Sequence, residues 1–355
     1  MHLVAYTEAP MLGGADISLA LLLGALDPSI RVTVVGVDGA VVDHVAAARP
    51  GTDVVLVPPV GGKLDLRGFL LHARALRRLR PDVVQANLHT PVAGRYTVLA
   101  AVLIPRVRVV VVEHLPTLAR PTRGQKLLKQ LTSRRVGAHV AVGVRAARWI
   151  ESLFGLRANS IGVIHNAVPD RPLRAPERLR PGPIVGTIGR LDTQKGHDLL
   201  VRALPQLPDV TAVIVGDGPE RDALASLAHE LGVHDRLVLT GWRDDARDLL
   251  TTFDVFALPS RFEGFPLVVL EAMLASLPVV AADVGSVSEA VLDGETGVLV
   301  DAEEVDSLAA AIAALLGDDT RRRTLGANAR SYVLENFSPA ATAKAFEALY
   351  EEILR

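Results

Sequence analysis

Two kinds of apolar pattern alternate along the chain. Short runs rich in β-branched residues predict buried strands, and longer stretches with apolar residues every three or four positions predict helices. Repeated alternation of the two is typical of an α/β protein with doubly wound parallel sheets. The predicted strands cover residues 2–6, 31–37, 53–57, 82–86, 107–112, 139–142, 183–188, 211–215, 236–240, 254–258 and 278–282. The predicted helices cover residues 15–26, 64–79, 91–103, 123–135, 144–154, 266–274, 305–316 and 338–354.

A proline-rich segment around Arg171-Pro172, Pro176 and Pro181-Gly182-Pro183 interrupts the alternation and has the composition of a linker. The charge changes sign across it. Residues 1–178 carry 23 Lys and Arg against 12 Asp and Glu, whereas the rest carries 15 against 28, for a net charge of −2. We therefore predict one domain over 1–178, a second over 179–336 and a separate last helix over 337–355.

Composition excludes several classes of protein. With 355 residues, of which 49% are apolar and 22% charged, the chain is globular and long enough for two domains. It has no cysteine, which excludes thiol nucleophiles, disulfides and Cys-ligated metals. Pro105, Arg106 and Arg108 break the longest apolar run before it reaches the length of a membrane span. The N-terminus lacks a basic leader, so we expect a cytoplasmic protein.

The stretch 260–273 reads Ser-Arg-Phe-Glu-Gly-Phe-Pro-Leu-Val-Val-Leu-Glu-Ala-Met and joins a predicted strand to a helix. Pro266 suits the first helical position, and Gly264 lets a ligand approach the backbone. The free N–H groups of the first turn, with the helix dipole, form an anion site. Glu263 precedes this site and Glu271 lies about one and a half turns into the helix. Such an arrangement suits a ligand with phosphate and several hydroxyls, such as a nucleotide sugar.

A second motif, Gly189-Arg-Leu-Asp-Thr-Gln-Lys-Gly196, leads from a strand into the next helix. Its two cations lie five residues apart in a loop bounded by glycine. Arg190 offers a planar fork for two oxygens and Lys195 a compact point charge, which together suit a diphosphate. The chain has 33 Arg but only 5 Lys, so the lysine is not the default of the composition.

The first half carries weaker signals. Gly13 and Gly14 lie between the first strand and helix, in the layout of a phosphate-approach loop. Histidines follow three of the strands, in Asn87-Leu88-His89-Thr90, Glu113-His114 and His165-Asn166. Because ligands of doubly wound sheets bind at the carboxyl ends of the strands, these residues predict a polar cleft.

The Glu263–Glu271 block closely resembles the donor-site signature of the retaining GT-B glycosyltransferases of family 4. In that family two glutamates separated by seven residues flank a Gly-Phe-Pro-type turn. The resemblance covers nearly the whole chain and is specific in the second half. It implies the GT-B fold: two Rossmann-like domains facing across a cleft, with a C-terminal helix returning to the first domain. Asp16 and Ala167 depart from the family, which commonly has Glu and Gly there.

The resemblance also implies an activity: metal-independent, retaining transfer of a hexose from a UDP- or GDP-sugar to a hydroxyl acceptor. The nucleotide sugar is a co-substrate, and no cofactor, metal or nucleic acid is expected. The first domain would bind the acceptor and the second the donor. The resemblance implies that Glu263 acts at the sugar and that His114 contacts the sugar from the opposite side. Arg190 and Lys195 would act at the leaving diphosphate, aided by N–H groups of residues 265–267. The donor-binding set is Gly13, Gly14, Gly189, Arg190, Lys195, Gly264, Phe265, Pro266, Leu267 and Glu271, with Glu271 on the ribose.

Several alternatives stay open. Glu263 acts either as a covalent nucleophile or only electrostatically, and both mechanisms are compatible with the sequence. A GT-B sugar-nucleotide epimerase and a non-catalytic sugar-nucleotide-binding protein are the two rival functions. An epimerase would change the sugar of a donor without any acceptor, a transferase would at most hydrolyse it slowly, and a binding protein would do neither.

The acceptor is the least determined partner. Basic amphipathic helices attract anionic membranes and anionic ligands, so we hypothesise an anionic or lipid-linked acceptor and peripheral contact with the inner face of the membrane. The alternative is an arginine-rich composition on ordinary solvated surfaces. In the 64–79 helix, Arg67, Arg74 and Arg78 lie opposite Leu66, Phe69, Leu70 and Ala73. A second basic stretch contains Arg120, Arg123, Lys126, Lys129, Arg134 and Arg135.

Overall fold

The computed structural model describes residues 1–61, 65–116, 119–174 and 176–355, which divide into two compact units. Unit 1 contains Met1–Pro169 and Ser338–Arg355, and unit 2 contains Asp170–Phe337. The chain therefore divides after Pro169, whereas the charge change predicted a division after residue 178. Asp170 explains the difference, because its carboxylate forms an ion pair of 2.6 Å with Arg330 of unit 2.

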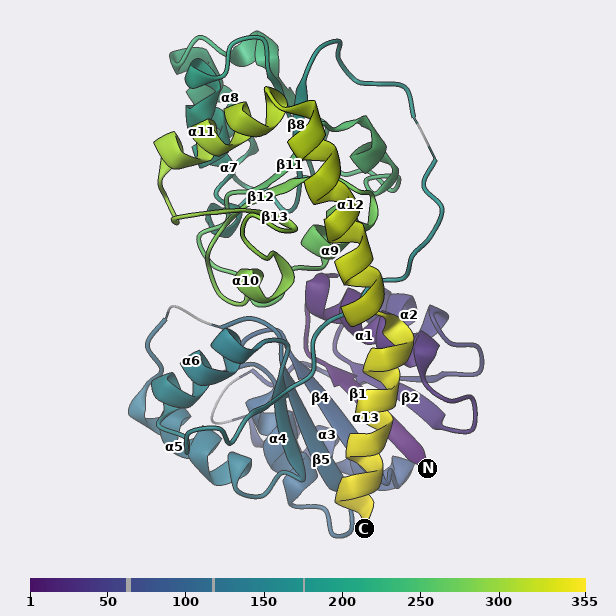
Figure 1. Ribbon diagram of the computed structural model, residues 1–355. Coiled ribbons are helices and arrows are strands. Elements are labelled where there is room, and N and C mark those ends of the chain that lie inside the picture. The colour runs from purple at the N-terminus through teal and green to yellow at the C-terminus, as the bar shows by residue number, and fades with distance from the viewer. Residues whose placement is uncertain (62–64, 117–118, 175) are drawn as a thin grey trace. The chain divides into compact units, whose positions relative to one another are not determined.

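Unit 1 is built on a parallel sheet with the strand order β3-β2-β1-β4-β5-β6-β7 (Figure 1). Its central strand β4 is buried along its whole length and β5 along all of it except Arg108, which is why they read as nearly continuous apolar runs. The strands are β1 (His2–Thr7), β2 (Arg31–Gly36), β3 (Asp53–Leu56), β4 (Val83–Leu88), β5 (Arg108–Glu113), β6 (Ala138–Ala141) and β7 (Gly162–Val163). The helices are α1 (Gly14–Ala25), α2 (Gly39–Ala47), α3 (Leu66–Leu79), α4 (Arg95–Val102), α5 (Arg123–Ser133), α6 (Val144–Phe154) and α13 (Pro339–Leu354).

Unit 2 repeats this architecture with the strand order β10-β9-β8-β11-β12-β13, again all parallel. One continuous apolar core lies under α7, α8 and α11. The strands are β8 (Ile184–Ile188), β9 (Thr211–Val215), β10 (Leu237–Leu239), β11 (Val255–Leu258), β12 (Val279–Ala282) and β13 (Gly297–Val300). The helices are α7 (His197–Ala203), α8 (Arg221–Glu230), α9 (Leu267–Leu274), α10 (Val287–Ala290), α11 (Val305–Leu316) and α12 (Asp319–Asn336).

The predicted doubly wound α/β fold class is therefore confirmed for both units. In each unit the strand order reverses at one point, between β1 and β4 in unit 1 and between β8 and β11 in unit 2. Ligands of open α/β sheets bind outside the carboxyl ends of the strands at such a switch point. The topology thus brings the 189–196 loop after β8 next to the 259–266 loop after β11.

The last helix, α13, belongs to unit 1 and lies beside α1 (Figure 1). Its Tyr350 is fully buried, and the hydroxyl donates to Gln85 Oε1 on β4. Gln85 Nε2 in turn donates to Asn87 Oδ1 at 2.9 Å. A buried polar chain therefore connects the C-terminal helix to the end of β4. Among the described residues, no helix combines the length and the apolarity that a bilayer crossing requires.

Candidate active site

The two motifs of unit 2 meet in one ion pair. Lys195 Nζ lies 2.7 Å from Glu263 Oε1, although the residues are 68 positions apart. The Glu263 side chain is only 5% exposed and that of Lys195 21%. Ser260 Oγ donates to the same oxygen at 2.8 Å. A largely buried, paired carboxylate and ammonium thus lie at the switch point, where a charged ligand would be shielded from solvent.

Backbone contacts hold the two loops against each other. Arg261 N–H donates to Gln194 O at 2.8 Å, and Gln194 Nε2 donates to Phe262 O at 3.1 Å. Gly196 has φ 62°, and a Cβ there would overlap Pro259 O. Position 196 therefore requires glycine. A Cβ at position 189 would make only ordinary contacts with the Lys195 side chain.

Arg190 is held by a carboxylate of its own loop. Its Nε lies 2.6 Å from Asp192 Oδ2, and its side chain is 56% exposed. Asp192 also caps the 3₁₀ helix η1 (Thr193–Lys195), because its Oδ1 accepts the Lys195 N–H at 3.2 Å. The structure thus places both predicted cations on one loop, and Asp192, which the sequence analysis did not single out, organises both.

The Gly-Phe-Pro turn differs in detail from the prediction. Pro266 is extended and caps α9, so the helix begins at Leu267, one residue later than expected. Proline has no N–H, and of residues 265–267 only Phe265 and Leu267 can donate. The Phe265 ring is buried against Phe337, with 5.1 Å between ring centroids, so its side chain belongs to the core.

A neighbouring loop fixes the backbone of this turn. Ser286 N–H donates to Gly264 O at 3.0 Å. Gly285 has φ 53°, and a Cβ there would overlap Glu263 O. The loop after β12 therefore packs directly on Glu263 and Gly264, and glycine at position 285 allows this approach.

Glu271 lies on α9 and is half-buried. Burial raises the pKa of its carboxyl, and the charges of Arg247 and Arg171 oppose this. Among the described residues none hydrogen-bonds to its carboxylate. The two glutamates of the motif therefore have different surroundings: Glu263 is paired and Glu271 is not.

In unit 1, His114 is the first residue after β5, and its N–H donates to Leu88 O at 3.0 Å. Burial lowers the pKa of this imidazole to about 4, although the Glu113 charge acts in the opposite direction. Neither ring nitrogen has a hydrogen-bond partner in the described part of the chain. A buried, neutral imidazole without a partner has hydrogen-bonding capacity left for a ligand.

Gly13 and Gly14 are exposed at the start of α1, and neither has a positive φ. Asp16, which departs from the family pattern, has a clear role here. Its Oδ1 accepts from Thr7 Oγ1 at 2.6 Å and its Oδ2 from Gly13 N–H at 3.1 Å. The carboxylate therefore ties the glycine loop to the end of β1. Burial raises the pKa of Asp16, and these two hydrogen bonds oppose the shift.

The other candidate positions of unit 1 are partly structural. Asn166 Oδ1 accepts from Ser18 Oγ at 2.7 Å, and His165 O accepts from Thr342 Oγ1 on α13 at 3.3 Å. His89 is half-buried and lines a hollow of about 400 Å³ at the carboxyl ends of β1 to β4. Glu8, Asp38 and Arg95 also line it, which makes its wall polar.

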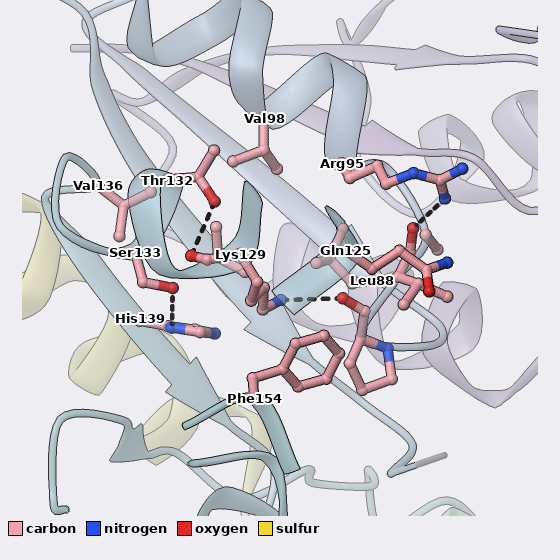
Figure 2. Close-up of a pocket in the computed structure, with 14 residues that line it drawn as sticks. Leu88, Arg95, Val98, Gln125, Lys129, Thr132, Ser133, Val136, His139 and Phe154 are labelled. Carbon is pink, nitrogen blue, oxygen red and sulfur yellow. Dashed lines mark hydrogen bonds between the residues drawn. The ribbon is translucent and has the colours of Figure 1, made fainter. Parts of the chain in front are cut away.

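One expectation about the basic stretch at 120–135 is wrong. Lys129 is not a surface cation: its side chain is 9% exposed and pairs with the buried Glu113. Figure 2 shows it beside His139 and Phe154 at a second cavity. That cavity measures about 20 Å³, which is room for one water and not for a sugar.

Comparison with known proteins agrees with the sequence resemblance. The model for "Glycosyltransferase Family 4" matches residues 12–171 and that for "Glycosyl transferases group 1" matches residues 172–332. The lipopolysaccharide core biosynthesis mannosyltransferase LpsB of Rhizobium meliloti is 33% identical over 62% of this chain and 67% of its own length. A GDP-mannose-dependent phosphatidylinositol monomannoside mannosyltransferase of Mycolicibacterium smegmatis is 34% identical over 58% of this chain.

The match covers 60% of the length of that mycobacterial relative, so the chain spans only part of it. Among solved structures, Anabaena HepE in complex with UDP superposes with a TM-score of 0.82 over 98% of this chain and 99% of its own. Its sequence identity of 24% makes this a likeness of fold.

Proposed function

Because the chain belongs to the family 4 glycosyltransferases of the GT-B fold, we propose that it is a retaining hexosyltransferase. It would move a sugar from a nucleotide-diphosphate sugar to a hydroxyl group of an acceptor. The observation that carries this proposal is the shielded Lys195–Glu263 pair at the switch point of unit 2, with Arg190 on the same loop.

The donor's diphosphate would bind to the cations of the 189–196 loop. Lys195 uses one of its three N–H bonds for Glu263 and has two left for phosphate oxygens. Arg190, whose side chain is 56% exposed, would exchange the Asp192 carboxylate for a phosphate, a bidentate partner of the same kind. The N–H groups of Phe265 and Leu267 at the start of α9 would complete the anion site.

The sugar and ribose would contact the carboxylates. Glu263, held by Ser260 and Lys195, would accept hydrogen bonds from sugar hydroxyls and place negative charge near the anomeric carbon. The Glu271 carboxylate accepts no hydrogen bond from the described residues and would bind the ribose hydroxyls. His114 of unit 1 would contact the transferred sugar through its unpartnered ring.

The acceptor would bind in unit 1, in the polar hollow at the ends of β1 to β4. We further propose peripheral contact with an anionic membrane through α3 and α5. Leu66 and Leu70 are 70% and 49% exposed on α3, next to the exposed Arg67, Arg74 and Arg78. On α5, Leu127 and Leu131 are 58% and 46% exposed. Exposed leucine together with cations is typical of a helix that lies on an anionic surface.

A donor panel with and without acceptors tests the activity. GDP-mannose and UDP-glucose come first, since the mycobacterial relative is named as GDP-mannose-dependent and HepE was solved with UDP. We expect transfer to a hydroxyl acceptor, only slow hydrolysis without one, and retention of the anomeric configuration by NMR. Epimerisation of the donor sugar, or binding with neither hydrolysis nor transfer, would establish one of the rival functions instead.

A further inference from the structure

A buried cluster of charged residues lies directly behind His114. Glu113 is completely buried, and its Oε1 contacts both Lys129 Nζ and His139 Nε2, the latter at 2.9 Å. Burial by itself would raise the pKa of Glu113, but Lys129 and His139 outweigh it and hold the pKa at about 2. The cluster therefore contains one carboxylate and one ammonium.

Three elements are joined by Lys129. It projects from the buried face of α5, reaches the end of β5 at Glu113, and donates to Pro91 O at 3.2 Å in the loop after β4. The same loop contains His89, and the end of β4 accepts the His114 N–H through Leu88 O. Removing Lys129 would thus leave Glu113 with His139 but without an ammonium partner, and would release the Pro91 carbonyl in the loop that borders His114.

The charges around His114 come from few groups. Glu113 on β5 and His89 after β4 act on the His114 imidazole itself. His139 on β6 is in turn affected by Glu113, Lys129 and Glu151 of α6, and burial lowers its pKa. Asp16 of α1 lies near His89. Within this set Lys129 is the cation that balances Glu113.

We propose that Lys129 is a positioning residue for His114: by neutralising Glu113 and holding the Pro91 carbonyl, it keeps the imidazole at the end of β5 uncharged and in place. This inference rests on the proposed role of His114 at the sugar. Lys129 would thus set the charge of His114 through Glu113, without touching the substrate itself.

The test is Lys129→Met in the full-length protein, with Lys129→Arg as the conservative variant and Lys344→Met, an exposed lysine of α13, as the control. NMR titration of the imidazole signals, assigned with His114→Gln, reports the charge of His114 without any turnover. We expect Lys129→Met to raise the pH at which His114 becomes protonated by about one unit or more, since the charge of the neighbouring Glu113 is then no longer balanced by an ammonium group. The acid limb of kcat/KM should move in the same direction, and Lys129→Arg and Lys344→Met should leave both unchanged.

A double variant separates this effect from loss of structure. In Glu113→Gln/Lys129→Met both charges are gone, so the His114 titration should return to that of the wild type even if the protein is less stable. If Lys129→Met lowers the melting temperature or kcat but leaves the His114 titration in place, or if only His139 changes its titration, the inference is wrong. If no sugar is transferred by any variant, the proposed function fails, and the NMR titration still decides the role of Lys129.

Discussion

At the scale of single residues, Lys195 is the side chain on which the proposed site most depends. Negative charge grows on the leaving diphosphate in the transition state, so Lys195→Ala and Arg190→Ala should each lower kcat about 10²–10³-fold, or roughly 3–4 kcal/mol. Steady-state kinetics with a saturating donor measures this. Arg202→Ala, an exposed arginine of α7, is the matched control and should keep its kcat. A kcat near the wild-type value in Lys195→Ala would contradict the assignment.

Two buried histidines, His114 and His197, predict sensitivity to acid. Burial lowers the pKa of each to about 4, whereas an unfolded histidine titrates near 6.5. Between these values the unfolded chain binds more protons, so the free energy of unfolding should fall as the pH drops from about 6.5 to 4, by up to about 3 kcal/mol per histidine.

Denaturant unfolding at pH 7 and pH 5 measures this loss. His197→Leu removes one titrating group and should reduce the difference between the two pH values, whereas replacing the exposed His44 should not. An equal loss of stability in the wild type and in His197→Leu would mean that His197 does not titrate in this range.

At the scale of elements, α13 is anchored to β4 through the Tyr350 hydroxyl. Tyr350→Phe leaves Gln85 Oε1 buried without this donor, which should lower the free energy of unfolding by about 1–3 kcal/mol. Urea denaturation measures the change. Tyr332→Phe is the control, because that half-buried hydroxyl makes a long contact of 3.4 Å with Glu289 O. Identical unfolding of Tyr350→Phe and the wild type would show that the buried hydrogen bond adds nothing.

The exposed face of α3 predicts binding to anionic vesicles. At about 1 kcal/mol per cation, reversing Arg67, Arg74 and Arg78 to Glu should weaken binding by about 10²-fold or more at low salt. Co-sedimentation with anionic and neutral vesicles measures it. The matched control reverses Arg202, Arg321 and Arg323, three exposed arginines of unit 2. Equal binding to both lipids would leave a soluble acceptor as the partner.

At the scale of the whole molecule, the proposed reaction uses cations and backbone N–H groups where other transferases use a divalent ion. Arg190, Lys195 and the first turn of α9 would neutralise the diphosphate by themselves. Activity should therefore persist in excess chelator. Transfer that EDTA abolishes and Mg²⁺ or Mn²⁺ restores would contradict this part of the proposal.

Most of the fold could be predicted from local pattern, and the exceptions have physical reasons. α2 is short and apolar along most of its length, so its helical start is signalled only by Asp38, whose carboxylate caps Val41 N–H at 3.1 Å. α12 is largely polar and lacks the apolar stripe that marks other helices, so the apolar pattern did not predict it. In α3, Leu66 and Leu70 are exposed and the buried face is formed by Gly68, His72 and Leu76, so the apolar residues there do not all face inward.

The sequence by itself determined the doubly wound class and the two short motifs of unit 2, because strand, loop and helix signals depend on residues a few positions apart. Only the tertiary structure decided which charges meet. Lys195 reaches Glu263, Lys129 reaches Glu113, and Tyr350 reaches Gln85 across the chain. These pairings follow from strand order and helix packing, and no local pattern distinguishes a lysine that will be buried beside a carboxylate from one that will stay in water.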